Sequence, residues 1–462
     1  MASNGLRRFE AIRERHIAAT RAYVDEAVDR LGWSRERVVR WQTECLRALV
    51  ARAVAGSAYY RERLGGVDVA KLDARDLSSL PILTKGDVMA NWDQIVTDSR
   101  LRIDEVTQHL EDLHQGRKDN AYYLDEYLIA ATGGTSGTRG VFVWDWQMAL
   151  VNPAGHYRWE AQADRENPPS GPRRTAVICA SSFVHASRFV FPVMVDPERE
   201  SRVFPAGMPI AEMVEALNEY QPDRIVGFAS IVEELAEYAI EGALRVAPNR
   251  VSTNSEPFDE HGRKLVRDAW GLETHGTWGS VEIGVAAVEG PSFGGLSLAE
   301  DLAIFEVVDE YDQPVDDPAD ANRVLVTRLY GSTMPLIRYE MTDTLILDEG
   351  PNPDAIGCRR VVRIEGRADV WFVYGDTKIH PMVFRDILGQ RHEISEYQVQ
   401  QTKTGARVLA ILHGQLDLRE VEVSLESSLR NAGLLHPEVA VESATALPRH
   451  PETNKLKRFV PL

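Results

Sequence analysis

The apolar positions of the first 65 residues recur at helical spacing and predict a helical opening. The stripe consists of Trp41, Leu46, Leu49, Val50, Ala53 and Val54. Gly65 and Gly66 then end the pattern. In the segment LPILTKGDV, the Thr84 hydroxyl can cap a short helix whose first turn holds Asp87.

From about residue 122, short apolar runs alternate with helical patterns. The run TAVICA at residues 175–180 is continuously apolar, as expected of a strand buried on both faces. A helix is expected over residues 210–220, then a strand over residues 223–230. A further helical stripe is formed by Ile231, Leu235, Ala239 and Ile240. This alternation predicts an α/β domain with a mostly parallel sheet.

After about residue 297 the apolar runs favour antiparallel pairing. They are AIFEVVD, RVLVTRL, TLILD and RVVRIEG. The following stretch predicts a hairpin (residues 397–401 and 407–413), a helix over residues 418–434 and a strand near residues 439–442. We therefore expect an N-terminal core of residues 1–366, mostly helical over 1–120, and a small α+β domain of residues 367–462.

Composition and charge argue against a nucleic-acid-binding protein and against a disulfide-rich or zinc-binding one. The chain has 462 residues, with 52 basic and 70 acidic side chains and a net charge of −18. Such an acidic chain has no electrostatic reason to bind nucleic acid, so any anionic ligand must be held by a local site. Only Cys45, Cys179 and Cys358 are present, without CxxC spacing, which argues against disulfides or a thiolate zinc site. A reducing cytoplasm is the expected location.

No membrane association is expected from the apolar segments. The charged stretch MASNGLRRFEAIRERH lacks the apolar region of a signal peptide. The apolar stretch of residues 189–195 is too short to span a bilayer.

The segment AATGGTSGTRG at residues 130–140 carries the strongest chemical signal. Its glycines let backbone N–H groups approach an anion, its hydroxyls can donate to that anion, and Arg139 adds positive charge. The alternative is a flexible linker. The segment lacks the GK[ST] ending of a P-loop NTPase, and the chain has no GxGxxG after its first strand, which argues against a dinucleotide-dependent oxidoreductase.

This loop resembles the Thr-Ser-Gly-Thr-Thr-Gly loop of the adenylate-forming superfamily, which includes acyl-CoA synthetases, peptide-synthetase adenylation domains and luciferases. Five further segments resemble the superfamily's motifs in the same order. They are NSEPF (254–258), WGSVE (278–282), RYEMTD (338–343), IEGRADVWFVYGDTKIHP (364–381) and PRHPETNKLKR (448–458). The segment LRALVARAVAGSAYYRERL, followed by LPILTKGDV, is similar to the N-terminus of phenylacetate–CoA ligases. The resemblance implies a large α/β domain with a mobile C-terminal domain.

The resemblance implies a nucleotide site for ATP and Mg²⁺. Lys455 would be catalytic, stabilising negative charge as a carboxylate attacks the α-phosphate. Asp343 would accept both ribose hydroxyls, Glu282 would bind Mg²⁺ and Asp369 would be the hinge. The remaining ATP or AMP contacts would be Thr135, Ser136, Gly137, Thr138, Arg139, Gly140, Ser255, Glu256, Pro257, Trp278, Gly279, Ser280 and Arg367.

Four of these residues could instead have an ordinary structural role. Asp343 could be a surface residue at a strand end, Glu282 a helix N-terminal residue and Trp278 a core residue. Lys455 could be one solubilising lysine beside Lys457.

The acyl pocket is the least defined part of the resemblance. It would be lined by His185, Phe228, Ala229, Gly276 and Thr277. Small residues at positions 229 and 276 favour a modest or flat acid such as an aryl acid, while His185 could equally be structural.

The resemblance implies an AMP-forming ligase that activates a small carboxylic acid and transfers the acyl group to CoA. An amine or a carrier protein is the alternative acceptor, and a homodimer is one open quaternary state. The chain departs from the family in having Val141, Phe142 and Val143 where relatives carry Pro-Lys, so we expect Arg139 to supply the missing cation. A non-catalytic nucleotide-binding protein is the rival from another class.

Overall fold

The structure is a computed structural model. It describes residues 4–132, 140–166, 168, 173–179, 200–255, 258, 260–309, 311–315, 323–341, 343–348, 350–365, 372–389, 391, 393–412, 414–448 and 458–462.

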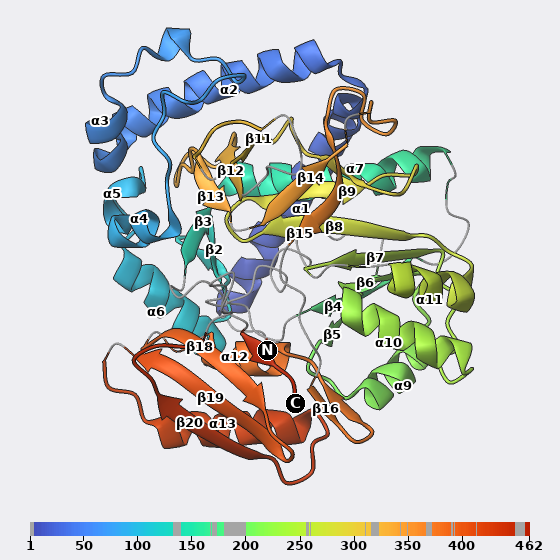
Figure 1. Cartoon of the computed structure of the whole chain (residues 1–462). Coiled ribbons are helices and arrows are strands. Elements are labelled where there is room, and N and C mark those ends of the chain that lie inside the picture. Colours follow the sequence, from blue (N-terminus) through green and yellow to red (C-terminus); the bar gives the residue numbers. More distant parts are fainter. Residues whose placement is uncertain are drawn as a thin grey trace.

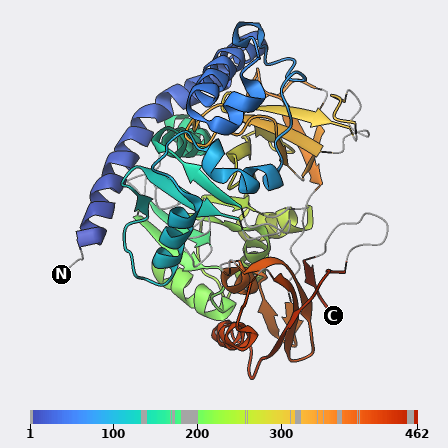
Figure 2. The same ribbon diagram turned by 90° about the vertical axis from the view of Figure 1, so that its left-hand side faces the viewer.

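Helices form the N-terminal part of the chain, as the apolar stripe predicts, and α1 runs along the outside of the molecule (Figure 2). The Thr84 cap is also confirmed, because its hydroxyl and the Asp87 carboxylate each accept the other residue's backbone N–H. The elements are α1 (Asn4–Asp29), η1 (Arg30–Gly32), α2 (Arg35–Gly56), α3 (Ala58–Leu64), η2 (Val69–Lys71), α4 (Lys85–Ala90), α5 (Trp92–Ile95) and α6 (Ile103–His114).

A nine-stranded sheet crosses the middle of the described chain (Figure 1). Its order is β14-β15-β10-β9-β8-β7-β6-β4-β5. Strands β5, β4, β6, β7 and β8 are parallel, as predicted, and the rest pair antiparallel. The strands are β4 (Arg174–Cys179), β5 (Glu200–Pro205), β6 (Arg224–Phe228), β7 (Arg250–Asn254), β8 (Thr274–Ser280), β9 (Gly284–Glu289), β10 (Leu296–Leu298), β14 (Thr344–Leu347) and β15 (Arg360–Glu365).

Helices cover the parallel half of this sheet, and two smaller antiparallel sheets complete the large unit. The helices are α7 (Trp146–Glu166), α9 (Ile210–Tyr220), α10 (Ala229–Ile240) and α11 (Glu260–Trp270). The small sheets contain β1 (Tyr122–Tyr123), β2 (Tyr127–Ala131) and β3 (Val141–Trp144), and β11 (Ala303–Val308), β12 (Arg323–Arg328) and β13 (Tyr339–Met341).

Two sequence expectations here were wrong in detail. The strand expected over residues 223–230 ends at Phe228, and Ala229 begins α10. An apolar run that continues from a buried strand into a buried helix gives no boundary signal. Ile240, expected on the buried stripe of α10, is 50% exposed because it ends the helix.

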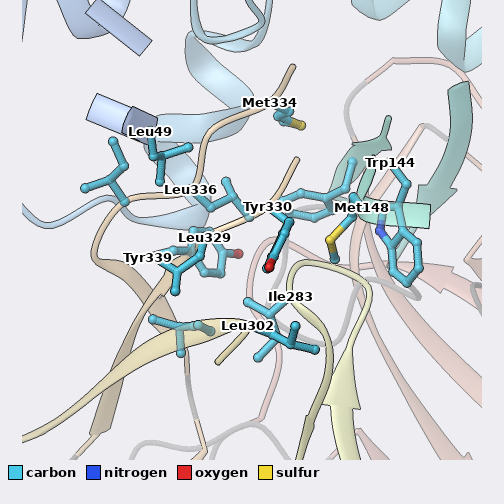
Figure 3. Packing of buried hydrophobic residues seen from close by; sticks show 14 of the residues in the cluster. Leu49, Trp144, Met148, Ile283, Leu302, Leu329, Tyr330, Met334, Leu336 and Tyr339 are labelled. Atoms are coloured by element: carbon cyan, nitrogen blue, oxygen red, sulfur yellow. The ribbon is translucent and has the colours of Figure 1, made fainter. Parts of the chain in front are cut away.

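The largest hydrophobic cluster joins the N-terminal helices to the sheets. Leu49 of α2, Trp144 of β3, Met148 of α7 and Tyr339 of β13 all belong to it (Figure 3). These side chains come from segments far apart in the sequence, so the positions of the predicted motifs depend on one shared core.

The C-terminal unit has a hydrophobic cluster of its own. It lies beside α9 and α10 of the large unit (Figures 1 and 2). The predicted hairpin is confirmed, and the helix expected over residues 418–434 ends at Asn431. The elements are β16 (Phe372–Tyr374), β17 (Thr377–Ile379), α12 (Met382–Leu388), β18 (Ile394–Gln401), β19 (Gly405–Leu412), α13 (Leu418–Asn431), β20 (Glu438–Ser443) and β21 (Phe459–Val460).

Candidate active site

Part of the predicted site lies outside the described residues, and those roles stay predictions. This part comprises Thr135, Ser136, Gly137, Thr138, Arg139, His185, Glu256, Pro257, Arg367, Asp369 and Lys455. The described part comprises Gly140, Phe228, Ala229, Ser255, Gly276, Thr277, Trp278, Gly279, Ser280, Glu282 and Asp343.

The two ends of the glycine-rich loop are joined by hydrogen bonds. The Thr132 N–H donates to the Gly140 carbonyl at 2.9 Å, and the Gly140 N–H donates to the Thr132 hydroxyl at 2.9 Å. A Cβ at Gly140 would lie 2.5 Å from the Phe142 ring and 2.8 Å from Cε of Lys85. Glycine is therefore required here by close packing rather than by backbone conformation.

Lys85 brings a positive charge to the foot of this loop. Its Nζ donates to the Thr132 hydroxyl at 2.8 Å. The lysine opens α4, whose start is held by the Thr84 capping box. The preceding Leu83 exchanges backbone hydrogen bonds with Arg338 and Glu340 at 3.0 Å each. The sequence predicted a helix cap in this segment and a resemblance to phenylacetate–CoA ligases, but it did not single out Lys85.

Tyr339 connects two of the predicted motifs and the strand that follows a third. It lies in RYEMTD, and its ring makes an edge contact with Phe142, with centroids 6.2 Å apart, just after the glycine-rich loop. Its hydroxyl donates to Oε1 of Glu282, in WGSVE, across 3.5 Å. Burial raises the pKa of Tyr339 far above its usual value, so the hydroxyl keeps its proton and acts as the donor.

Glu282 lies in the turn between β8 and β9, so the helix N-terminal alternative is wrong. Arg328, a residue that sequence reasoning missed, holds this turn. Its guanidinium donates to the carbonyl oxygens of Glu282 (2.8 Å), Met334 (2.6 Å) and Gly331 (3.3 Å). Burial lowers the pKa of Arg328 to about 10, although the nearby Asp145 charge opposes that shift.

The donor chemistry at Glu282 fits a magnesium ion. Mg²⁺ is commonly held by one or two carboxylates together with substrate phosphates rather than by a complete protein cage. Among the described residues, no group of three or more His, Cys, Asp or Glu side chains could form such a cage. Asp343, the predicted ribose contact, lies between β13 and β14 and is half-buried.

The predicted acyl pocket falls at the carboxyl ends of three adjacent parallel strands. Phe228 pairs with Asn254 of β7, and Asn254 pairs with Thr277 of β8. Ligands of open parallel sheets bind at this edge. Ser255 follows β7 with a positive φ of 67° and donates to the Asn254 side chain at 2.9 Å.

Glu289 fixes the backbone of β8 beside this pocket. Its carboxylate is fully buried and accepts from the Gly276 N–H (3.0 Å), the Gly294 N–H (2.9 Å) and Arg263 (2.8 Å). Trp278, the predicted adenine contact, is 8% exposed and packs near Phe305, with ring centroids 6.1 Å apart. Trp278 thus packs as a core residue, which was the alternative to a nucleotide contact. Its contact with adenine stays a prediction.

The segment that contains Lys455 is anchored at both ends on β18. Gln398 donates to the Pro448 carbonyl at 3.1 Å. On the other side, Arg458 donates to the Tyr397 carbonyl at 2.9 Å and accepts at its own carbonyl from the Val399 N–H at 2.8 Å. The stems of this segment therefore move with the C-terminal sheet.

Comparison with known proteins identifies the fold through solved structures. No family model matches the chain, and no curated protein matches it. A 2-hydroxyisobutyryl-CoA ligase in complex with 2-HIB-AMP and CoA, in the thioesterification state, superposes with a TM-score of 0.60 at 16% identity, covering 94% of this chain and 91% of that one. The chain has the adenylate-forming enzyme fold. The same ligase in the postadenylation state gives a TM-score of 0.54 at 15% identity, covering 91% and 88%.

The adenylate-forming fold confirms the fold class predicted from the six motifs. The domain boundary at residues 366–367 stays a prediction because residues 366–371 lie outside the described part. No helix among the described residues is long and apolar enough to cross a membrane. On this fold, Tyr339 contacts Glu282 and also Phe142, two residues after the glycine-rich loop.

Proposed function

We propose that this chain is an AMP-forming ligase for a small carboxylic acid. The acid and ATP would give acyl-AMP and pyrophosphate, and the acyl group would then pass to an acceptor. The observation that carries the proposal is the position of Tyr339, in the strand before Asp343, where it contacts both Glu282 and the strand that follows the glycine-rich loop. The rival is a nucleotide-binding protein without catalytic activity, and such a protein would not need Lys455.

Different residues of the chain would bind ATP and stabilise the transition state in the first step, the adenylation. Backbone N–H groups of residues 133–140 and the Lys85 ammonium would hold the phosphates, since Lys85 reaches the foot of that loop. Asp343 would accept from the ribose hydroxyls. A magnesium ion bound to Glu282 would neutralise phosphate charge. Lys455 would stabilise the negative charge that develops at the α-phosphate.

The acceptor in the proposal is CoA, and the overall resemblance is to the phenylacetate–CoA ligase branch. The acyl pocket at Phe228, Ala229, Gly276 and Thr277 would take a modest acid, with an aryl acid as the first choice. The C-terminal unit of residues 367–462 would turn about Asp369 between the two steps. The proposed location is the cytoplasm.

A pyrophosphate-release screen tests this proposal. Purified wild-type protein and the Lys455→Ala variant are incubated with ATP, Mg²⁺ and a panel of aryl and short aliphatic acids. We expect at least one acid to drive pyrophosphate release in the wild type and a loss of about a hundredfold or more in the variant. Equal inactivity of both proteins across the panel would favour the non-catalytic nucleotide-binding protein.

Product analysis then separates the acceptors. Each active acid is incubated with CoA and, in parallel, with primary amines, and the products are identified by mass spectrometry. A thioester supports the CoA ligase. If an amide forms and no thioester does, the acceptor is an amine rather than CoA. Pyrophosphate release with neither product would indicate a carrier-protein acceptor.

A further inference from the structure

His380 is a buried histidine that the C-terminal unit presents to the large unit. It follows β17 directly, precedes α12, and is 2% exposed. Its imidazole lies against the Phe228 ring, with centroids 5.2 Å apart and planes 36° apart. Phe228 ends β6, at the sheet edge where the acyl pocket is proposed. A titratable side chain from one unit thus reaches the acyl end of the other.

A narrow cavity between the two units has His380 in its wall. Its lining residues are contributed by β17 and α12 on one side and by α9, α10 and the turn after β5 on the other. Most are apolar, including Met208, Met213, Ile231 and Val383. Water enters such a space poorly, so proton transfer there depends on side chains rather than on bulk solvent.

Lys378, two residues before His380, contacts two carboxylates of α10. Nζ of Lys378 lies 3.8 Å from Oε1 of Glu234 and 3.6 Å from Oε2 of Glu237. Burial raises the pKa of the Glu234 carboxyl, and the charges of Lys378 and His380 oppose that shift. Among the described residues, Oε2 of Glu234 has no hydrogen-bond partner.

We infer that His380 is the general base of the acyl-transfer step, which rests on the proposed function. The acceptor thiol or amine attacks the carbonyl carbon of acyl-AMP, forming the C–S or C–N bond. The bond between that carbon and the phosphate oxygen breaks, and AMP leaves with the electron pair. His380 takes the proton that the acceptor loses and later releases it to solvent. The first step, in which no acceptor takes part, needs no such base.

The test compares the two half-reactions in His380→Gln, His380→Phe and wild-type enzyme. Adenylation is measured as ATP–pyrophosphate exchange with the acid that releases pyrophosphate fastest. Transfer is measured in single turnover from enzyme-bound acyl-AMP to CoA and to cysteamine, between pH 6 and pH 9. His436→Gln is the matched control, because His436 is an exposed histidine of the same unit.

We expect exchange within about twofold of wild type in every variant, and transfer about a hundredfold slower in both His380 variants. The defect of His380→Gln in transfer to CoA should be largest near pH 6 and should shrink toward pH 9, because a thiol with a pKa of about 8.5 then ionises without a base. His436→Gln should behave as wild type in both steps.

Wild-type transfer rates in His380→Phe would overturn the inference. So would an equal loss of exchange and transfer, which would indicate a structural role at the interface, or a transfer defect of the same size at pH 6 and at pH 9. Absence of exchange in the wild type with every acid would instead overturn the proposed function, and the inference with it.

Discussion

Replacing Arg328 by methionine should loosen the turn that holds Glu282. Arg328 is 1% exposed and donates to three carbonyl oxygens, two of them within 2.8 Å. Leaving these buried acceptors without donors costs about 5 kcal/mol. Burial of the guanidinium lowers its pKa from the usual value to about 10, so removing this buried charge restores about 3 kcal/mol of stability. The expected net loss of stability is about 2 kcal/mol.

The assay combines stability with the metal dependence of activity. A loss of about 2 kcal/mol in a unit of this size lowers Tm by about 3 °C in calorimetry. Displacing the carbonyl of Glu282 should also weaken the proposed metal site, raising the Mg²⁺ concentration for half-maximal pyrophosphate release about tenfold. Arg323→Met is the matched control. It removes an arginine from the same strand whose carboxylate partners, Asp312 and Glu340, are partly exposed, so Tm should change little.

Two results would refute this reasoning. An Arg328→Met protein with wild-type Tm would mean that the three carbonyls find other donors. A reduced Tm with an unchanged magnesium requirement would separate the turn from the metal site, and Glu282 would lose its proposed role.

Three further predictions concern the glycine-rich loop and a buried histidine of α1. Lys85→Met should raise the KM for ATP about tenfold, because a charge-assisted hydrogen bond to the phosphates is lost. If Arg139 is the missing cation, Arg139→Ala should raise this KM further. Steady-state kinetics measure the KM for ATP in both variants. Gly140→Ala should abolish pyrophosphate release while the protein stays folded by circular dichroism, since the new methyl group would overlap the Phe142 ring. The pKa of buried His16 is lowered by burial from 6.5 to about 4, so the unfolded chain binds the extra proton between these values. Stability should therefore be intact above pH 6.5 and fall by about 3 kcal/mol towards pH 4, and His16→Asn should reduce that slope in Tm measurements.

Hydrophobic periodicity predicted the elements well where one face is buried throughout. The strand at residues 174–179 and the helix at residues 210–220 were both expected from their apolar runs. The boundary between β6 and α10 was missed because Phe228, Ala229 and Ile231 are all buried, so neither a period of two nor one of 3.6 stands out. Helix ends depend on capping and solvent, and the pattern of apolar residues encodes these weakly.

The resemblance implied that RYEMTD and WGSVE lie at one site, and Tyr339 does contact Glu282, but the residues that hold these motifs were not predicted. Arg328 ends an apolar strand and looks like a surface residue in the sequence, yet it joins the turn of Glu282 to the loop that follows its own strand. Glu289 likewise carries no local signal, because its partners Gly276 and Arg263 lie on other elements. Long-range hydrogen bonds of this kind leave no periodic trace in one sequence.

The packing of the C-terminal unit couples the two proposed steps. Phe372 and Ile379 of the β16–β17 hairpin share one hydrophobic cluster with Phe459, which follows the segment that contains Lys455. His380 and the stems of the Lys455 segment therefore belong to one body, so any rotation of that body moves both. In the present arrangement the hairpin is held on α10 by Lys378, and His380 faces the acyl end of the sheet. Lys455 acts in the first proposed step and His380 in the second. One rotation of the C-terminal unit would therefore withdraw Lys455 from the nucleotide and bring His380 to the acyl-AMP. The acyl-AMP would meet its base only after the catalytic lysine has left.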